Sequence, residues 1–307
     1  MPTQQAWRPA PRGYRLYNRG VPPLVNPEML RLTVARTILS KTSGFIAAAG
    51  FTHSLTPARN CTFGCTYCYV PTMRVQGGLQ PEDWKHWGQF TTIKSNTAEL
   101  LRRELRESQK IYCSPLVDPY QPAEEQARLM PRILDELIDA PPRVFVLQTR
   151  GPLVLRDREQ LKQLSKRTTL RVSFSITTNR EDVRKLYEPL CAPIAERLAV
   201  MRALRAEGIE TYATLAPLLP CDPEELARAA IEASGRDLIG DPLHTRIAKP
   251  YGATTRDAAL RISEKHDYEC WHEPAFQASI VERIQNAAKM AGFTIATGPE
   301  GFARLVR

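Results

Sequence analysis

The sequence predicts an α/β fold built around a parallel β-sheet. From about residue 96 to about residue 240, short apolar segments alternate with longer amphipathic ones, and this strand-plus-helix unit recurs five or six times. The chain has 307 residues, of which 43% are hydrophobic and 24% charged, so it can bury a sizeable core. Because the connecting helices cover a parallel sheet, we expect both of its faces to be buried.

The first part of the chain is basic and rich in proline. Residues 1–26 contain four arginines and five prolines without a clear period, which predicts an irregular arm over the body of the protein. Asn26 and Pro27 suit an N-cap and a first helical position, so we expect a helix from there to about Ser40. Residues 51–55 alternate like a first strand that leads into a cysteine-rich segment.

The segment from about residue 71 to residue 89 combines glycines with aromatic residues. Gly77 and Gly78 indicate a loop or a short hairpin. Trp84 and Trp87 either pack this loop or stack on a base.

The repeating part follows in order. Apolar, β-branched runs predict strands at 111–117, 143–149, 170–177, 210–215 and 237–239. Amphipathic runs with capping residues predict helices at 96–109, 122–139, 153–166 and 194–207, and another from residue 222. The last seventy or so residues depart from the repeat, with a long helix at 274–290 and a final strand or cap at 292–295.

Three cysteines dominate the chemistry of the segment from Asn60 to Tyr69. Cys61, Cys65 and Cys68 have the spacing Cys-x3-Cys-x2-Cys, which can wrap a loop around one soft metal centre. Three thiolates suit a 4Fe–4S cubane and leave one iron without a protein ligand. Gly64 permits the tight backbone that such a loop requires.

The same cysteines are also compatible with zinc binding or with a structural role. A structural zinc site needs a fourth ligand and usually a second Cys or His pair, but only His53 lies nearby, eight residues upstream of Cys61. Seven cysteines in a long chain without a signal peptide do not suggest a disulfide framework. Zinc binding and buried structural thiols remain the alternatives. No run is apolar and long enough to span a membrane, so we expect a cytoplasmic protein with reduced thiols.

The cysteine segment resembles that of the radical S-adenosylmethionine (radical SAM) superfamily. This resemblance implies an incomplete (β/α)6 barrel, a 4Fe–4S cluster held by Cys61, Cys65 and Cys68, and S-adenosylmethionine chelated by the open iron. It also implies reductive cleavage to a 5′-deoxyadenosyl radical that abstracts hydrogen from a substrate, with flavodoxin or ferredoxin as electron donor. The expected division is a basic arm and helix at 1–49, the barrel at 50–240 and a helical extension packed on it at 241–307.

Further stretches resemble the group related to spore photoproduct lyase, over roughly residues 50–235. The matching stretches are 118–122, 149–157, 172–178 and 214–218, with Glu188-Pro189 and Glu196-Arg197-Leu198 between the last two. The group implies a lyase-like enzyme of DNA repair.

The resemblance also suggests roles for single residues near S-adenosylmethionine. Tyr67 and Tyr69 flank the last cysteine, where the superfamily contacts adenine, although simple packing is the alternative. Arg150 stands where the lyase group has a lysine near the methionine carboxylate, and a guanidinium can pair with that carboxylate through two bonds. Ser175 matches a serine that bonds S-adenosylmethionine, or it bonds backbone. Asp118 accepts from ribose hydroxyls or caps the next helix.

Cysteines outside the motif suggest a hydrogen donor. Spore photoproduct lyase returns hydrogen to its product radical through a cysteine at the end of the second strand, and Pro115 occupies that place here. Cys113 lies two residues earlier, on the same face of a strand, so it is either a shifted donor or a buried small apolar residue. Cys191 and Cys221 lie in predicted loops and could hold or donate something.

The charge of the chain bears on its partner. With 42 Lys and Arg against 33 Asp and Glu, the net charge is +9, which favours polyanions but is also common in proteins that bind no nucleic acid. We therefore expect a radical SAM enzyme whose substrate is a nucleic-acid base or lesion, with a small molecule or a protein still open. The alternative is a nucleic-acid-binding protein with a structural or redox-sensing iron–sulfur cluster.

Overall fold

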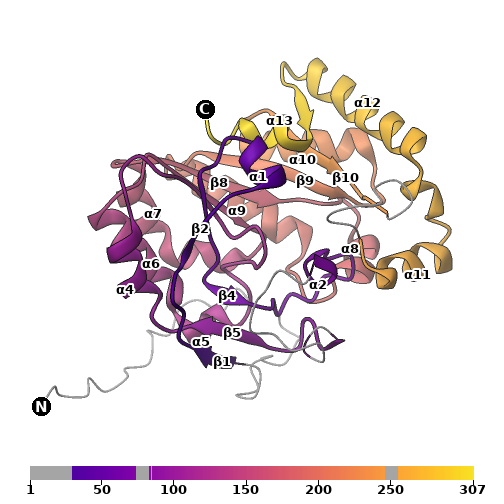
Figure 1. Ribbon diagram of the computed structural model, residues 1–307. Helices are drawn as coiled ribbons and strands as arrows, with labels where there is room; N and C mark the ends of the chain where they lie inside the picture. Colours follow the sequence, from indigo (N-terminus) through magenta and orange to yellow (C-terminus); the bar gives the residue numbers. More distant parts are fainter. Residues whose placement is uncertain (1–29, 74–82, 84, 246–254) are drawn as a thin grey trace, which may run out of the picture.

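The computed structural model describes residues 30–73, 83, 85–245 and 255–307. Its centre is an eight-stranded sheet with the order β11-β10-β9-β8-β7-β6-β3-β2 (Figure 1). The strands from β11 to β3 pair in parallel, and β2 pairs antiparallel with β3. Their bounds are Leu39–Lys41 (β2), His53–Leu55 (β3), Lys110–Cys113 (β6), Val144–Thr149 (β7), Thr169–Ser175 (β8), Thr211–Leu218 (β9), Leu238–Pro242 (β10) and Ile295–Thr297 (β11). This parallel sheet confirms the predicted α/β class and is consistent with a partial barrel.

Helices that connect the strands pack on one face of the sheet. They are α4 (Thr97–Glu104), α6 (Leu129–Asp139), α7 (Arg158–Ser165), α9 (Ile194–Ala206), α10 (Pro223–Ser234) and α12 (Pro274–Met290). In Figure 1, α4, α6 and α7 lie side by side, and α10 contacts both α9 and α12. Their leucines, such as Leu134 and Leu204, pack against Phe145 and Val172 of the sheet in the larger core.

The other face of the sheet is covered by α1 (Gly44–Ala48) and α13 (Gly298–Ala303), which contact each other (Figure 1). There Tyr112 and Val146 pack against Phe302 in a second, smaller core. Because successive strand residues point to opposite faces, neighbours such as Tyr112 and Cys113 belong to different cores.

The helix predicted from Asn26 to Ser40 is wrong, as far as the described residues reach. Residues Leu30–Thr33 form β1, which pairs in parallel with β5 (Thr91–Lys94) in a small sheet that also contains β4 (Ala58–Arg59). A residue far along the chain, Asn96 at the start of α4, fixes the extended segment that follows β1. The Asn96 amide bonds both the N–H and the C=O of Ala35, each at 2.9 Å. The signal for a helix was local, whereas these partners lie about sixty positions away in the sequence.

Several other elements differ from their predicted bounds. The helix expected at 122–139 is divided into α5 (Glu124–Ala127) and α6 by Arg128, which has φ of +45°. The strand β11 pairs with β10, so the C-terminal segment continues the parallel sheet instead of departing from it. The helix expected at 153–166 is likewise divided, into η2 (Pro152–Asp157) and α7. Elements that were not predicted include α2 (Val70–Met73), α8 (Glu181–Tyr187), α11 (Asp257–Lys265) and η3 (Glu269–His272).

Some expectations fall on residues that the structure does not describe. These are the basic arm, the N-cap at Asn26 and the loop glycines and Trp84. Trp87 is described and is buried, which agrees with packing of the loop. Within the described part of the chain, no helix has the length and hydrophobicity needed to cross a membrane.

Glu104 offers a test of how the strand β2 is held. Its carboxylate accepts the backbone N–H groups of Ile38 and Leu39, at 3.0 and 2.9 Å. Glu104→Ala removes the acceptor for both, so we expect the free energy of unfolding to fall by about 1–3 kcal/mol. Glu104→Gln retains an acceptor oxygen and should lose less, and the exposed Glu107→Ala should lose almost nothing. Equal losses for all three variants in denaturant titrations would contradict this role.

Candidate active site at the cysteine loop

The cysteine loop joins β4 to α2 and is held by a buried asparagine. Asn60 adopts φ of +61°, a left-handed conformation that asparagine tolerates, and is fully buried. Its side-chain oxygen accepts the N–H of Cys61 at 2.8 Å and that of Gly88 at 3.2 Å. The first cysteine is therefore fixed to its own loop and to the segment before β5.

Two glycines allow this loop to pack closely. Gly64 has φ of +58° and Gly88 has φ of +95°. A Cβ at Gly88 would lie 2.7 Å from the Cα of Gly64, which is too close for any side chain. The positive φ of Gly64 agrees with the prediction that this glycine permits a tight backbone. The close approach also requires a glycine at residue 88, which the sequence did not reveal.

A buried glutamine attaches the loop to the end of the second parallel strand of the main sheet, β6. Gln121 accepts the N–H of Thr62 at 2.7 Å and its hydroxyl at 3.0 Å, and donates to Thr91 at 3.2 Å. Gln121 lies beyond the C-terminal end of β6, where the catalytic loops of α/β barrels gather. The cysteine loop thus lies at the edge of the sheet where an active site is expected.

The three motif thiols gather around Cys65. Cys61 and Cys65 are buried and Cys68 is partly buried. Burial and the charges of Asp118 and Cys65 raise the pKa of Cys61, while burial and the charge of Cys65 raise the pKa of Cys68 to about 12. A hydrogen bond with Cys191 and the positive charge of Arg150 lower the pKa of Cys65 in spite of its burial. Cys65 is therefore the motif cysteine best placed to become a thiolate.

The donor set suits a cluster better than a single ion. Among the described residues, no three His, Cys, Asp or Glu side chains are grouped to hold a metal ion. All ligands of a zinc site bind the same ion and therefore lie close together. The three thiolates of a 4Fe–4S cluster bind three different irons, so their sulfur atoms are further apart. His53 lies in β3 and contacts the Thr52 hydroxyl at 2.9 Å. His53 thus bonds a neighbour beside its own strand, so it is not placed as the fourth ligand of a zinc site at the motif.

A buried ion network lies beside Cys65. Glu188 follows α8 and is fully buried between two arginines: Nη1 of Arg150 lies 2.5 Å from one carboxylate oxygen, and Nη1 of Arg197 lies 2.6 Å from the other. The hydroxyls of Tyr67 and Thr177 also donate to Glu188, at 2.5 and 2.9 Å. The two guanidinium groups thus share one carboxylate, and Asp118 is a second carboxylate whose charge reaches the cysteines.

The predicted site residue Arg150 is thus partly engaged by the protein. Its Nη1 bonds Glu188 and the hydroxyl of Tyr67, and its guanidinium carbon lies 5.8 Å from the centre of the Tyr67 ring. Its other guanidinium nitrogens bond no described residue, and the side chain keeps 15% of its surface exposed. Those nitrogens can therefore pair with the carboxylate of a bound molecule.

Asp118 and Ser175 both bond other protein groups. Asp118 accepts from the backbone N–H groups of Tyr120 and Arg150 and from the hydroxyl of Thr149, at 2.7–2.9 Å. It therefore ties the end of β6 to the end of β7. Ser175 accepts from the amide of Gln148 at 2.8 Å. Both remain predictions as ligands of S-adenosylmethionine.

Tyr69 and Cys113 differ in their placement. Tyr69 is partly buried, and its hydroxyl donates to the carbonyl of Pro115 at 2.7 Å, so it lies over the end of β6. Cys113 is fully buried in the larger core with Ile111 and Leu147, on the face of β6 that packs against helices. Gln148 bonds Tyr112, on the opposite face. This placement supports the alternative of a buried small apolar residue and gives the hydrogen-donor role of Cys113 no support.

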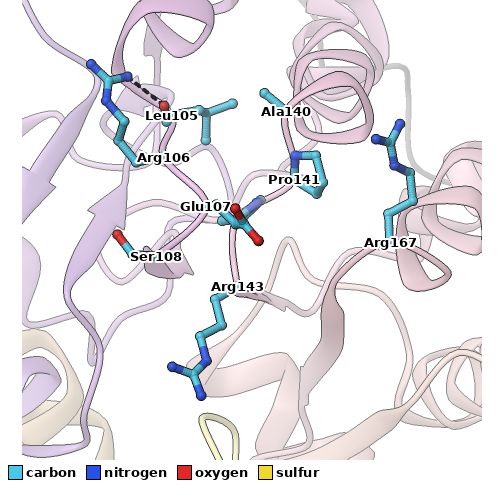
Figure 2. A pocket seen from close by; sticks show the side chains of 9 residues that line it. Leu105, Arg106, Glu107, Ser108, Ala140, Pro141, Arg143 and Arg167 are labelled. Carbon is cyan, nitrogen blue, oxygen red and sulfur yellow. Dashed lines mark hydrogen bonds between the residues drawn. The ribbon is translucent and has the colours of Figure 1, made fainter.

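A groove lies at the other end of the sheet. It is lined by residues that precede β6, β7 and β8, including Arg106, Arg143 and Arg167 (Figure 2). Figure 2 shows that these three arginine side chains point away from one another, so they do not converge on a common anion. The groove also lies at the N-terminal ends of the strands, opposite the edge where the cysteine loop lies.

Comparison with known proteins identifies the class. Residues 55–232, more than half of the chain, match the family model of the radical SAM superfamily. The chain therefore belongs to the radical SAM superfamily of enzymes, whose members use a 4Fe–4S cluster and S-adenosylmethionine.

Two uncharacterized proteins are similar in sequence to part of this chain. An uncharacterized protein of Methanocaldococcus jannaschii is 29% identical over 160 residues, which cover 52% of this chain and 58% of that protein. An uncharacterized protein of Mycobacterium tuberculosis is 28% identical over 235 residues, covering 73% of this chain and 64% of that protein. The chain thus spans less than two thirds of the length of both relatives.

Solved structures of spore photoproduct lyase share the fold. One mutant has a TM-score of 0.58 at 15% identity, covering 87% of this chain and 81% of that chain. Another, with bound AdoMet and dinucleoside spore photoproduct, has a TM-score of 0.52 at 17% identity, covering 78% of this chain and 66% of that chain. At these identities the likeness establishes the fold, and it agrees with the resemblance seen in the sequence.

Several residues that build the site carried no assigned role in the sequence. Glu188 and Arg197 stood in stretches that matched the lyase group, and Gln121 lay in another, but none had a chemical role. The available signal was a Glu and an Arg nine residues apart, the Glu in the segment between α8 and α9 and the Arg in the first turn of α9. Only the folded chain shows that they meet.

The Glu188 network predicts a pH dependence. Burial alone would raise the pKa of Glu188, but the charges of Arg197 and Arg150 and the bond from Tyr67 lower it from 4.5 to about 2. A lowered pKa contributes stability above pH 4.5 that is lost as the pH falls towards 2. We therefore expect Glu188→Gln to be less stable than the wild type at neutral pH by on the order of 3 kcal/mol, and the difference to shrink below pH 4.5.

The measurement is chemical denaturation of the metal-free protein from neutral pH to about pH 3. Glu282 is an exposed carboxylate on α12, so Glu282→Gln serves as the matched control. Its free energy of unfolding should equal that of the wild type at every pH. A stability difference for Glu188→Gln that stays constant over this range would contradict the ion network.

Proposed function

We propose that Cys61, Cys65 and Cys68 hold a 4Fe–4S cluster at which this enzyme cleaves S-adenosylmethionine. The observation that carries the proposal is the placement of these thiols on one buried loop at the C-terminal edge of the parallel sheet, beside the ion network of Arg150, Glu188 and Arg197. The cofactors supply the difficult chemistry, reductive cleavage to a 5′-deoxyadenosyl radical that abstracts hydrogen from the substrate.

The residues of the chain bind and orient S-adenosylmethionine and keep water away from it. Arg150 offers its free guanidinium nitrogens to the methionine carboxylate, while Glu188 holds its Nη1 in place. Tyr67 and Tyr69 border the adenine position, and Asp118 and Ser175 contribute polar groups from the ends of β6 and β8. Burial of the cysteine loop excludes water from the site, which preserves reactive intermediates.

A nucleic-acid base or lesion is the substrate class that we propose, as in a lyase-like DNA repair reaction. The net charge of +9 supports a polyanionic partner. The shared fold with spore photoproduct lyase supports the same class by analogy. Flavodoxin or ferredoxin fits as the electron donor, and the reducing cytoplasm fits an oxygen-sensitive cluster.

Release of 5′-deoxyadenosine is the direct test of the activity. Anaerobically reconstituted wild-type protein with dithionite should release 5′-deoxyadenosine from S-adenosylmethionine, measured by chromatography. Cys65→Ala should lose both iron and product because it removes a cluster ligand. Cys221→Ala, a buried thiol away from the motif, should retain both. A wild-type protein that binds iron but releases no product would favour the alternative, a structural or redox-sensing cluster in a nucleic-acid-binding protein.

The nucleic-acid partner has its own test. Titration of a DNA duplex at low and at higher salt should show binding that weakens steeply with salt, because cationic side chains displace counterions from phosphates. Binding by fluorescence anisotropy is the readout. No binding at low salt would remove nucleic acid as substrate and leave the S-adenosylmethionine reaction untouched.

A further inference from the structure

A fourth thiol contacts the cysteine motif. Cys191 lies between α8 and α9, and its Sγ is 3.8 Å from the Sγ of Cys65, within hydrogen-bond range for sulfur. Cys191 is 4% exposed. The two cysteines lie 126 positions apart in the sequence, so only the fold brings them together.

The backbone of Cys191 is held on both sides. Its N–H donates to the carbonyl of Glu188 at 3.0 Å, and its own carbonyl accepts from Nη1 of Arg184 at 2.9 Å. Arg184 also donates to the carbonyl of Glu188, at 3.0 Å. The position of the Cys191 thiol is therefore set by the same turn that carries the buried carboxylate.

The surroundings favour negative charge on sulfur. The positive charge of Arg150 acts on the Cys65 thiol, and that of Arg197 acts on the Cys191 thiol. Arg197 is fully buried, and one of its guanidinium nitrogens, Nη2, has no hydrogen-bond partner among the described residues. Arg197 pairs with Glu188 through Nη1, so Nη2 is a buried donor that lacks an acceptor among the described residues, and a cluster ligated by thiolates would supply one.

On this basis, and resting on the proposed function, we propose that Cys191 is a positioning residue that donates an S–H···S hydrogen bond to Cys65 and raises the reduction potential of the cluster. Cys65 bound to iron has no proton, so Cys191 must be the donor. A separation of 3.8 Å is also too short for two thiolates on different irons of one cubane, which separates this role from that of a fourth ligand. Hydrogen bonds to cluster sulfurs stabilise the more negative, reduced state.

The midpoint potential of the reconstituted cluster tests the proposal, measured by a redox titration followed by electron paramagnetic resonance. Cys191→Ala should shift the potential to a more negative value, and Cys191→Ser, which keeps a donor, should lie closer to the wild type. Cys221→Ala is the control and should match the wild type, because its thiol contacts no motif cysteine. An unchanged potential in Cys191→Ala, or a loss of iron that marks it as a ligand, would overturn the proposal.

A second measurement does not need the cluster. Diamide oxidises two adjacent thiols to a disulfide and takes up their two electrons and two protons. In metal-free wild-type protein, mass spectrometry should find Cys65 linked to Cys191, and absence of this pair would contradict the contact. If no cluster assembles in the wild type, the proposed function fails, whereas the diamide result still decides whether the two thiols touch.

Discussion

The site depends on one buried carboxylate. Glu188 receives hydrogen bonds or ion pairs from the cysteine loop through Tyr67, from the end of β7 through Arg150, from the end of β8 through Thr177 and from α9 through Arg197. A carboxylate with no exposed surface is stable only when such partners replace water. Four segments that are distant in the sequence are therefore required to meet at one point, directly beside Cys65.

The second constraint is close packing of the cysteine loop. Asn60 and Gln121 supply the acceptors that the loop backbone lacks, and the contact between Gly64 and Gly88 leaves no room for a side chain. A loop fixed in this way holds its thiols without needing the regular hydrogen bonds of a helix or strand. The loop is a preorganised ligand set, and the Glu188 network places two guanidinium groups beside it.

The sequence was sufficient for the parts of this architecture that are local. The strand β7 has a continuous apolar run, the strands β8 and β9 are rich in β-branched and aromatic residues, and the helices α10 and α12 begin with Pro after an acidic residue, so composition and caps identified them. The cysteine spacing likewise identified the class of chemistry. The helix expected before Ser40 was wrong because Asn96, which precedes α4, and Glu104, the last residue of α4, hold that segment extended. Glu188, Arg197 and Cys191 were visible as residues, but their roles come from contacts across more than a hundred positions or between buried charges, which no local pattern encodes.

The most direct measurement is the electron paramagnetic resonance spectrum of the anaerobic, dithionite-reduced protein before and after addition of S-adenosylmethionine. Three thiolates leave one iron open, so we expect the signal of a reduced 4Fe–4S cluster, with a shape that changes when S-adenosylmethionine binds. A protein that carries zinc and gives no iron–sulfur signal, or a signal that S-adenosylmethionine leaves unchanged, would contradict the assignment of Cys61, Cys65 and Cys68.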